Sequence, residues 1–121
     1  MTPKEAYNFV ERLGLKRHER SELIIMKDPE YAYYYARFII KGRFIEAEPA
    51  IMKSPMWAYE YATNIIDGRW IEGEPIIIND PRYVCLYAQK VIKGRWPEAE
   101  PYIIKDLYWW DWYKRHFNID D

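Results

Sequence analysis

A segment of 26 residues repeats along this chain. The text Gly-Arg-(Trp or Phe)-x-Glu-x-Glu-Pro begins at Gly42, again at Gly68 and again at Gly94. A fixed period of this size is the signature of a stacked array, in which each unit buries its apolar face against its neighbours. The repeat therefore predicts a solenoid-like stack.

Five helix starts are spaced by the same 26 residues. Each is a residue whose side-chain oxygen can cap a helix, and four of the five are followed by Pro, which is well tolerated at the first helical position. The capping residues are Thr2, Asp28, Ser54, Asp80 and Asp106. We therefore expect a single domain over residues 1–121, with five units that begin near residues 2, 28, 54, 80 and 106.

A longer helix should follow each cap, and a shorter helix should follow the Gly-Arg text. The longer helices are expected over 3–13, 29–41, 55–67, 81–93 and 107–117. Gly42, Gly68 and Gly94 are expected to end the central three in the left-handed conformation, which glycine adopts at low cost. The shorter helix should be imperfect, because a proline falls near the end of its first turn.

Each central longer helix carries a row of mostly aromatic residues beside a row of mostly small ones. The rows are Tyr31, Tyr35, Ile39 and Ala32, Ala36, Ile40 in the second unit; Trp57, Tyr61, Ile65 and Ala58, Ala62, Ile66 in the third; and Tyr83, Tyr87, Val91 and Val84, Ala88, Ile92 in the fourth. Rings of one helix can then lie over the small residues of the next. The predicted fold is all-α, a solenoid-like stack of five helix-pair repeats whose first and last units are degenerate caps.

The repeat text resembles that of uncharacterised small proteins of tailed bacteriophages, which carry short helical tandem repeats similar to Y-A-x-x-V-I-x-G-R-W-P-E-A-E-P. The resemblance covers residues 22–105 or so, and residues 87–101 show it most clearly. It implies a phage-encoded factor that binds or inhibits a host or defence protein. It brings no known activity, cofactor or functional residue.

Composition excludes several classes of protein. A formal net charge of −1 and an isoelectric point near 6.1 remove the electrostatic attraction that most nucleic-acid-binding proteins show. The single cysteine, Cys85, allows no intramolecular disulfide and is typical of a reducing compartment, so we expect a cytoplasmic protein, in the host cytoplasm for a phage product. No apolar stretch approaches the ~20 residues of a membrane span, and no membrane association is expected.

An arginine and two glutamates recur together in each central unit. The sets are Arg43 with Glu46 and Glu48, Arg69 with Glu72 and Glu74, and Arg95 with Glu98 and Glu100. The arginines could form a ladder that grips the phosphates of single-stranded RNA, with nearby rings for its bases. Alternatively, each Arg pairs with a Glu of its own or the adjacent unit. We favour the ion pairs, because a phosphate ladder does not need its own neutralising acids.

No catalytic motif is recognisable, so we expect no enzyme, no cofactor and no metal site. Paired carboxylates act in glycosidases, but a catalytic pair has no reason to recur at the period of the fold. His18 and His116 lie in opposite caps, have no partners at metal-ligand spacing, and are expected at the surface. Cys85 stands where other units have Tyr33 and Tyr59, and is expected to be a half-buried small hydrophobe rather than a reactive thiol.

The outward face of the longer helices varies between units, although the core rows do not. The candidate partner-binding residues on it are Tyr34, Arg37, Met56, Glu60, Arg82 and Leu86. Tyr33 and Tyr59 are expected to contribute, because tyrosine is enriched at interfaces. The functional hypothesis is a non-enzymatic protein-binding module, with single-stranded nucleic-acid binding as the alternative. A solvated face that is free to vary is the structural alternative.

The last helix concentrates aromatic residues that one neighbouring unit cannot cover completely. They are Tyr108, Trp109, Trp110, Trp112, Tyr113 and Phe117. The repeat register leaves Trp110 and Trp112 outside, which predicts self-association through a two-fold homodimer contact. Alternatively, the tail at residues 118–121 folds back over Trp110 and completes the cap.

Overall fold

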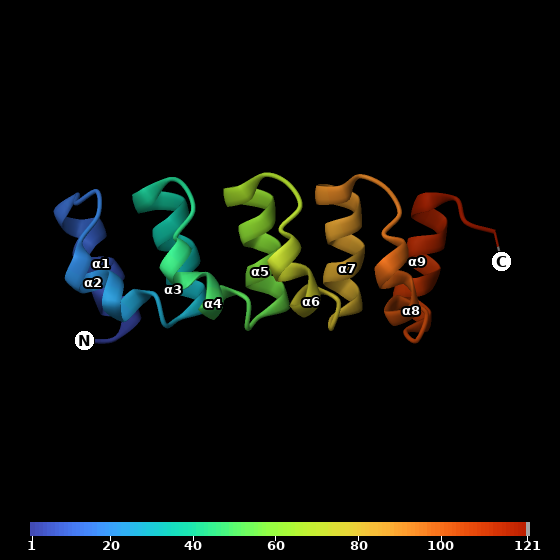
Figure 1. The fold of residues 1–121 in the computed structure, drawn as a ribbon, viewed down its shortest axis with the longest axis horizontal. Helices are drawn as coiled ribbons and strands as arrows, with labels where there is room; N and C mark the ends of the chain where they lie inside the picture. The colour runs from blue at the N-terminus through green and yellow to red at the C-terminus, as the bar shows by residue number, and fades with distance from the viewer. Residues whose placement is uncertain (121) are drawn as a thin grey trace.

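The computed structural model describes residues 1–120, and this part of the chain forms helices and loops without a β-strand. The longer helices are α1 (Pro3–Leu13), α3 (Pro29–Tyr34, continued by Tyr35–Ile40), α5 (Pro55–Tyr61, continued by Ala62–Ile66), α7 (Pro81–Tyr87, continued by Ala88–Ile92) and α9 (Leu107–Phe117). The shorter helices are α2 (Glu19–Ile25), α4 (Glu48–Ile51), α6 (Glu74–Ile77) and α8 (Glu100–Ile103). Figure 1 shows the longer helices side by side along the molecule, with the termini at opposite ends. The prediction of an all-α repeat stack is confirmed.

The caps place the start of every longer helix where the sequence predicts it. The side chains of Thr2, Asp28, Ser54, Asp80 and Asp106 each accept a backbone N–H of the following turn. Thr2 and Glu5 also form a reciprocal capping box. These bonds satisfy amide groups that the first turn of a helix leaves unpaired, so local chemistry sets the repeat boundaries.

The central longer helices end differently from the prediction. Their last turn is π-helical, and the residue before each glycine adopts the left-handed conformation. These residues are Lys41, Asp67 and Lys93, with φ angles of 61°, 58° and 62°. The prediction that Gly42, Gly68 and Gly94 take this conformation is therefore wrong. The helices end at residues 40, 66 and 92, one residue before the expected end, and the amide of the next residue bonds to the carbonyl oxygen five residues back, as Lys41 does to Ala36.

The core is built from small residues and large rings. The small positions are buried as predicted: Ala32, Ala36, Ala58, Ala62, Val84 and Ala88. In the aromatic row, Tyr35, Tyr61 and Tyr87 are fully buried, while Tyr31, Trp57 and Tyr83 are only half-buried. Each buried tyrosine packs on the ring after the loop arginine: Tyr35 on Phe44 at 5.1 Å, Tyr61 on Trp70 at 4.9 Å and Tyr87 on Trp96 at 4.8 Å between centroids.

Within residues 1–120, no helix is long and apolar enough to cross a bilayer.

Gly73 allows a test of this packing, because it stands where other units have Ala47 and Ala99. A Cβ on Gly73 would overlap the buried ring of Trp70. We expect Gly73→Ala to lower the free energy of unfolding by ~1–3 kcal/mol in urea denaturation, because the close-packed ring must shift. A Cβ on Gly68 meets open space, so Gly68→Ala should be neutral or stabilising. Equal stability of the two variants would contradict the described packing.

Candidate protein-binding face

A tyrosine hydroxyl joins each unit to the one before it. At the boundary of the second and third units, Tyr61 donates to Oε2 of Glu48 at 2.7 Å and accepts the backbone N–H of Phe44 at 2.8 Å. Arg43 donates through Nε and Nη2 to the two oxygens of the same carboxylate, both at 2.7 Å. Glu48 and Tyr61 are buried, so these bonds satisfy polar atoms that have lost their contact with water. We call this group the hydroxyl latch.

The hydroxyl latch occurs at four unit boundaries. Its members are Arg17, His18, Glu22 and Tyr35; Arg43, Phe44, Glu48 and Tyr61; Arg69, Trp70, Glu74 and Tyr87; and Arg95, Trp96, Glu100 and Tyr113. In the first set, Arg17 and His18 lie in the loop between α1 and α2, within the unit that the sequence predicts to be a degenerate cap. Phe9 stands at the tyrosine position of the first unit and has no hydroxyl group that could form a latch.

The environment of the latch favours a neutral tyrosine, and at Glu22 and Glu100 it favours an ionised carboxylate. The pKa of Tyr35 is raised to about 12, mainly by burial and to a smaller extent by the hydrogen bond to Glu22. Burial likewise raises the pKa of Tyr61 above its usual value. Arg95 holds the pKa of Glu100 below its usual value, despite the partial burial of that carboxyl group. The tyrosine therefore keeps its proton and can donate it across the neutral pH range.

The structure confirms that each loop arginine pairs with a glutamate of its own unit. The partner is the second glutamate of the repeat, at 2.7–2.9 Å, in all three central units. The first glutamate lies toward the preceding unit: Glu46 is 3.9 Å from Arg17. Because Nε and Nη2 of each loop arginine already hold a carboxylate, the arginines are poorly prepared to grip phosphate.

The surface of the longer helices that carries the variable residues is called the outer face. Four half-buried rings lie on it at the period of the repeat, and we call them the ring row: Tyr31, Trp57, Tyr83 and Trp109. Three of the rings contact a ring of the preceding unit, with centroid distances of 5.8 Å for Tyr7–Tyr31, 5.3 Å for Tyr33–Trp57 and 5.7 Å for Tyr59–Tyr83. At the fourth boundary the contact is made by the backbone of Trp109, whose carbonyl oxygen lies 3.6 Å from the Cys85 sulfur. A residue of the ring row therefore contacts the preceding unit at each of the four boundaries, through its ring at the first three.

Two of the predicted partner-binding residues lie in the second unit beside the ring row. Tyr34 is half-buried; its ring meets Trp57 edge-on at 5.6 Å, and its hydroxyl donates to Glu30 at 3.2 Å. Arg37 is exposed and donates through Nη1 to the hydroxyl of Tyr33 at 2.9 Å. Tyr34 and Arg37 are therefore held in place by neighbours while remaining accessible.

The other predicted partner-binding residues lie in the third and fourth units. They are Met56, Glu60, Arg82 and Leu86, each exposed or half-buried. Glu60 accepts a hydrogen bond from Asn64 at 3.0 Å, and the guanidinium of Arg82 lies over the ring of Tyr83 at 4.8 Å. All six predicted residues are thus reachable from solvent on the outer face, and their chemistry changes from unit to unit.

Two tyrosines that were expected on this face are buried instead. Tyr33 is 2% exposed and Tyr59 8% exposed, because this position packs against the ring row of the next unit. The Tyr33 hydroxyl still accepts hydrogen bonds from Arg37 and Asn64, at 2.9 and 2.8 Å. Cys85 at the same position is fully buried rather than half-buried, and burial raises the pKa of its thiol to about 12. A reactive thiolate is therefore disfavoured.

At the C-terminal end, Trp110 and Trp112 are half-buried rather than fully outside. The ring of Trp110 stacks on Tyr113 at 5.7 Å, and the ring of Trp112 stacks on His116 at 4.8 Å. Ile119 from the tail lines an apolar hollow of about 590 Å³ together with Trp110. The described part of the tail therefore lies on the same side of the molecule as Trp110, the side on which the alternative expectation placed it; residue 121 lies outside the described residues.

The most exposed large side chains at this end are not the two tryptophans that were predicted to lie outside; Tyr108 was named only as one of the six aromatic residues, and Leu107 was not among them. Leu107 is 82% exposed and Tyr108 is 70% exposed. The sequence does mark this position as unusual, because Leu107 stands where the other units have Pro3, Pro29, Pro55 and Pro81. An apolar residue replaces proline only in the last unit.

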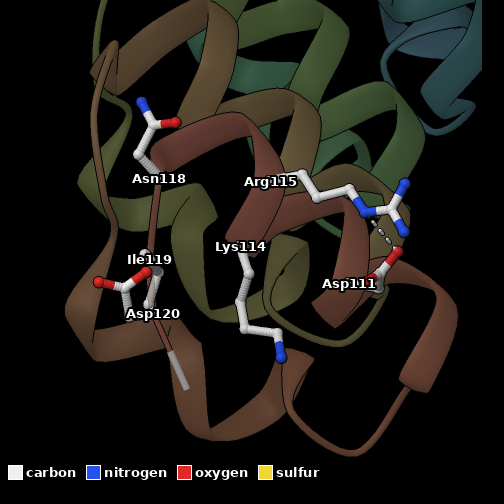
Figure 2. A pocket seen from close by; sticks show the side chains of 6 residues that line it. All are labelled: Asp111, Lys114, Arg115, Asn118, Ile119 and Asp120. Carbon is white, nitrogen blue, oxygen red and sulfur yellow. Dashed lines mark ion pairs between the residues drawn. The ribbon is translucent and has the colours of Figure 1, made fainter.

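A polar hollow of about 460 Å³ lies at the end of α9 (Figure 2). It is lined by Asp111, Lys114, Arg115, Asn118, Ile119 and Asp120, and Arg115 pairs with Asp111 at 3.1 Å. None of these lining residues is buried, so the hollow has the character of an open polar surface.

Within residues 1–120, no group of three His, Cys, Asp or Glu residues could hold a metal ion. His116 is exposed as expected, whereas His18 is half-buried because it caps α2 through Ser21.

Two features distinguish the molecule: the hydroxyl latch is the same at four unit boundaries, and the outer face changes along the stack. Comparison of the chain with protein-family models, with curated proteins and with solved structures found no match.

The contribution of the latch to stability can be measured by removing one oxygen atom. Tyr87→Phe takes away the hydroxyl that holds Glu74 at 2.7 Å and the backbone N–H of Trp70 at 2.8 Å. We expect the free energy of unfolding in urea to fall by ~1–3 kcal/mol, because a buried N–H loses its partner. Tyr102→Phe at an exposed ring is the matched control, with an expected change within ~0.5 kcal/mol. A loss at Tyr87 no larger than that of the control would show that the latch does not stabilise the stack.

Proposed function

We propose that this chain is a non-enzymatic protein-binding module and that its contact surface is the outer face. The observation that carries the proposal is the ring row, four partly accessible aromatic residues flanked by side chains that differ in every unit. Aromatic residues, methionine and arginine are enriched at protein interfaces. In repeat arrays, variation on a constant scaffold is the usual way of encoding a specific partner.

The rigidity of the scaffold supports this proposal. Rings of the ring row pack on rings of the preceding unit, and hydrogen bonds of the latch hold the helices that carry them. Side chains that are already held in place lose little conformational entropy on binding. A partner would therefore meet a surface that is largely prepared for contact.

Single-stranded nucleic-acid binding through Arg43, Arg69 and Arg95 is the alternative that we consider less favourable. Each of these arginines gives two donor nitrogens to a glutamate of its own unit. Phosphate would have to compete with that carboxylate, and the net charge of −1 adds no general attraction. A protein partner does not require such a competition.

The biological setting is a separate part of the proposal. A phage-encoded role in the host cytoplasm, with a host or defence protein as the partner, is supported by the resemblance of the repeat text alone.

Site-directed photocrosslinking in cells of the natural host tests the proposal. A benzophenone amino acid in place of Leu86 or Met56 should give discrete crosslinked protein bands, because both positions lie on the outer face. The same group in place of Ile71, an exposed residue of the segment before α6, is the matched control and should give none of these bands. Crosslinks from Ile71 alone would refute the proposed face. Salt-sensitive binding of fluorescent single-stranded RNA that is lost in an Arg69→Gln variant would favour the alternative.

A second proposal concerns a homodimer through the C-terminal end, and it is supported by the exposure of Leu107 and Tyr108. The contact would be centred on these two residues rather than on Trp110 and Trp112, which have neighbours in their own chain. Exposed apolar residues beside one another are typical of contact sites.

The double variant Leu107→Pro with Tyr108→Glu tests the homodimer, because the second unit has these residue types at the same positions, in Pro29 and Glu30. We expect light scattering after size exclusion to show a dimer for the unmodified chain and a monomer for the variant. A monomeric unmodified chain, or a dimer that survives the substitutions, would refute the contact.

A further inference from the structure

We infer that the partner segment recognised by the outer face is proline-rich and binds as a polyproline II helix along the ring row. The inference rests on the proposed function and names the chemistry of the partner. It is carried by three properties of the ring row: its spacing, its unused hydrogen-bond donors and the charges beside it.

The spacing of the ring row matches the pitch of a polyproline II helix. Neighbouring longer helices stand side by side and parallel (Figure 1), and α5 contacts both α3 and α7 directly. Helices that pack directly lie ~8–10 Å apart. A polyproline II helix advances ~9 Å in one turn of three residues. A proline at every third position would therefore meet one ring of each successive unit.

The ring row also offers hydrogen-bond donors. Within the described part of the chain, neither the hydroxyls of Tyr31 and Tyr83 nor the indole N–H groups of Trp57 and Trp109 make a hydrogen bond, although their rings are packed on neighbours. A polyproline II helix makes no internal hydrogen bonds, so its carbonyl oxygens are free to accept. Grooves lined with tyrosine and tryptophan bind such segments through ring contacts on proline and hydrogen bonds to carbonyls.

The charges along the ring row distinguish its two ends. Glu30 and Glu60 are half-buried carboxylates beside Tyr31 and Trp57, whereas the exposed Arg82 lies over the ring of Tyr83. A basic residue between the prolines would meet a carboxylate in the second or third unit. An acidic residue would meet Arg82 in the fourth, where it would share the guanidinium with Asp80, which lies 3.5 Å from Nη2. The complementary segment is therefore proline-rich, basic toward one end and acidic toward the other.

Titration with synthetic peptides tests the inference. Peptides of one to four Pro-Pro-x turns, with Lys in the turns at one end and Glu in those at the other, are titrated while tryptophan fluorescence is followed. We expect the affinity to rise with each added turn, because each turn reaches one more ring of the row. A Gly-Ser peptide of the same length and charge is the control and should bind at least about tenfold more weakly, since it is not pre-ordered.

Variants of the protein locate the contact. Trp57→Ala should weaken binding of the four-turn peptide by about tenfold, the effect expected of a central interface residue. Tyr83→Phe keeps the ring and removes only the donor, so it should weaken binding by a few-fold without affecting the fold. Ile71→Ala, away from the row, should leave the affinity unchanged. Equal binding of the Gly-Ser peptide, or no dependence on the number of turns, would overturn the inference.

The outcomes separate this inference from the proposed function. A protein crosslinked at Leu86 that lacks a proline-rich segment would refute the inference and leave the proposed face intact. Absence of crosslinking at both Leu86 and Met56, together with no peptide binding, would refute both.

Discussion

The fold depends on a hydroxyl group that reaches from one unit into the previous one. The tyrosine oxygen, with Tyr87 as an example, donates to the glutamate that an arginine already holds and accepts a backbone N–H from the loop between them. The loop, the shorter helix and the next longer helix are thereby joined at one buried point. Packing of rings and alanines supplies the apolar burial around it, but this point sets how one unit sits on another.

This arrangement divides the residues of each unit between two tasks. The arginine, the second glutamate and the buried tyrosine are the same at each central boundary, because a change in any of them would leave a buried polar group without a partner. Residues at the positions of Tyr34, Glu60 and Leu86 make no hydrogen bond of the latch, and they differ in size and charge. A constant interior and a variable surface are thus consequences of the same hydrogen-bond geometry, and binding is best sought where the sequence is free.

Predictions from the sequence succeeded where the cause is local. Helix starts follow from capping side chains such as Asp28, and burial of Ala32 or Ala62 follows from helical spacing. They failed where the outcome depends on another unit. The period does not reveal how far one helix is rotated against the next, so Tyr33 was placed on the surface although it packs beneath Trp57. The first latch was missed because its loop reads differently, yet its arginine and glutamate keep the five-residue spacing of the other sets.

Every latch connects only neighbouring units, and this has a consequence for how the molecule opens. In such a one-dimensional array, the free energy of folding is a sum over units and boundaries, and within residues 1–120 the first and last units stand at opposite ends of the stack (Figure 1). Opening can therefore proceed inward from either end while the middle stays folded, and amide exchange should be slowest around α5. A ligand that spans several units would act as a splint: it would couple boundaries that are otherwise independent and make the stack melt as one body.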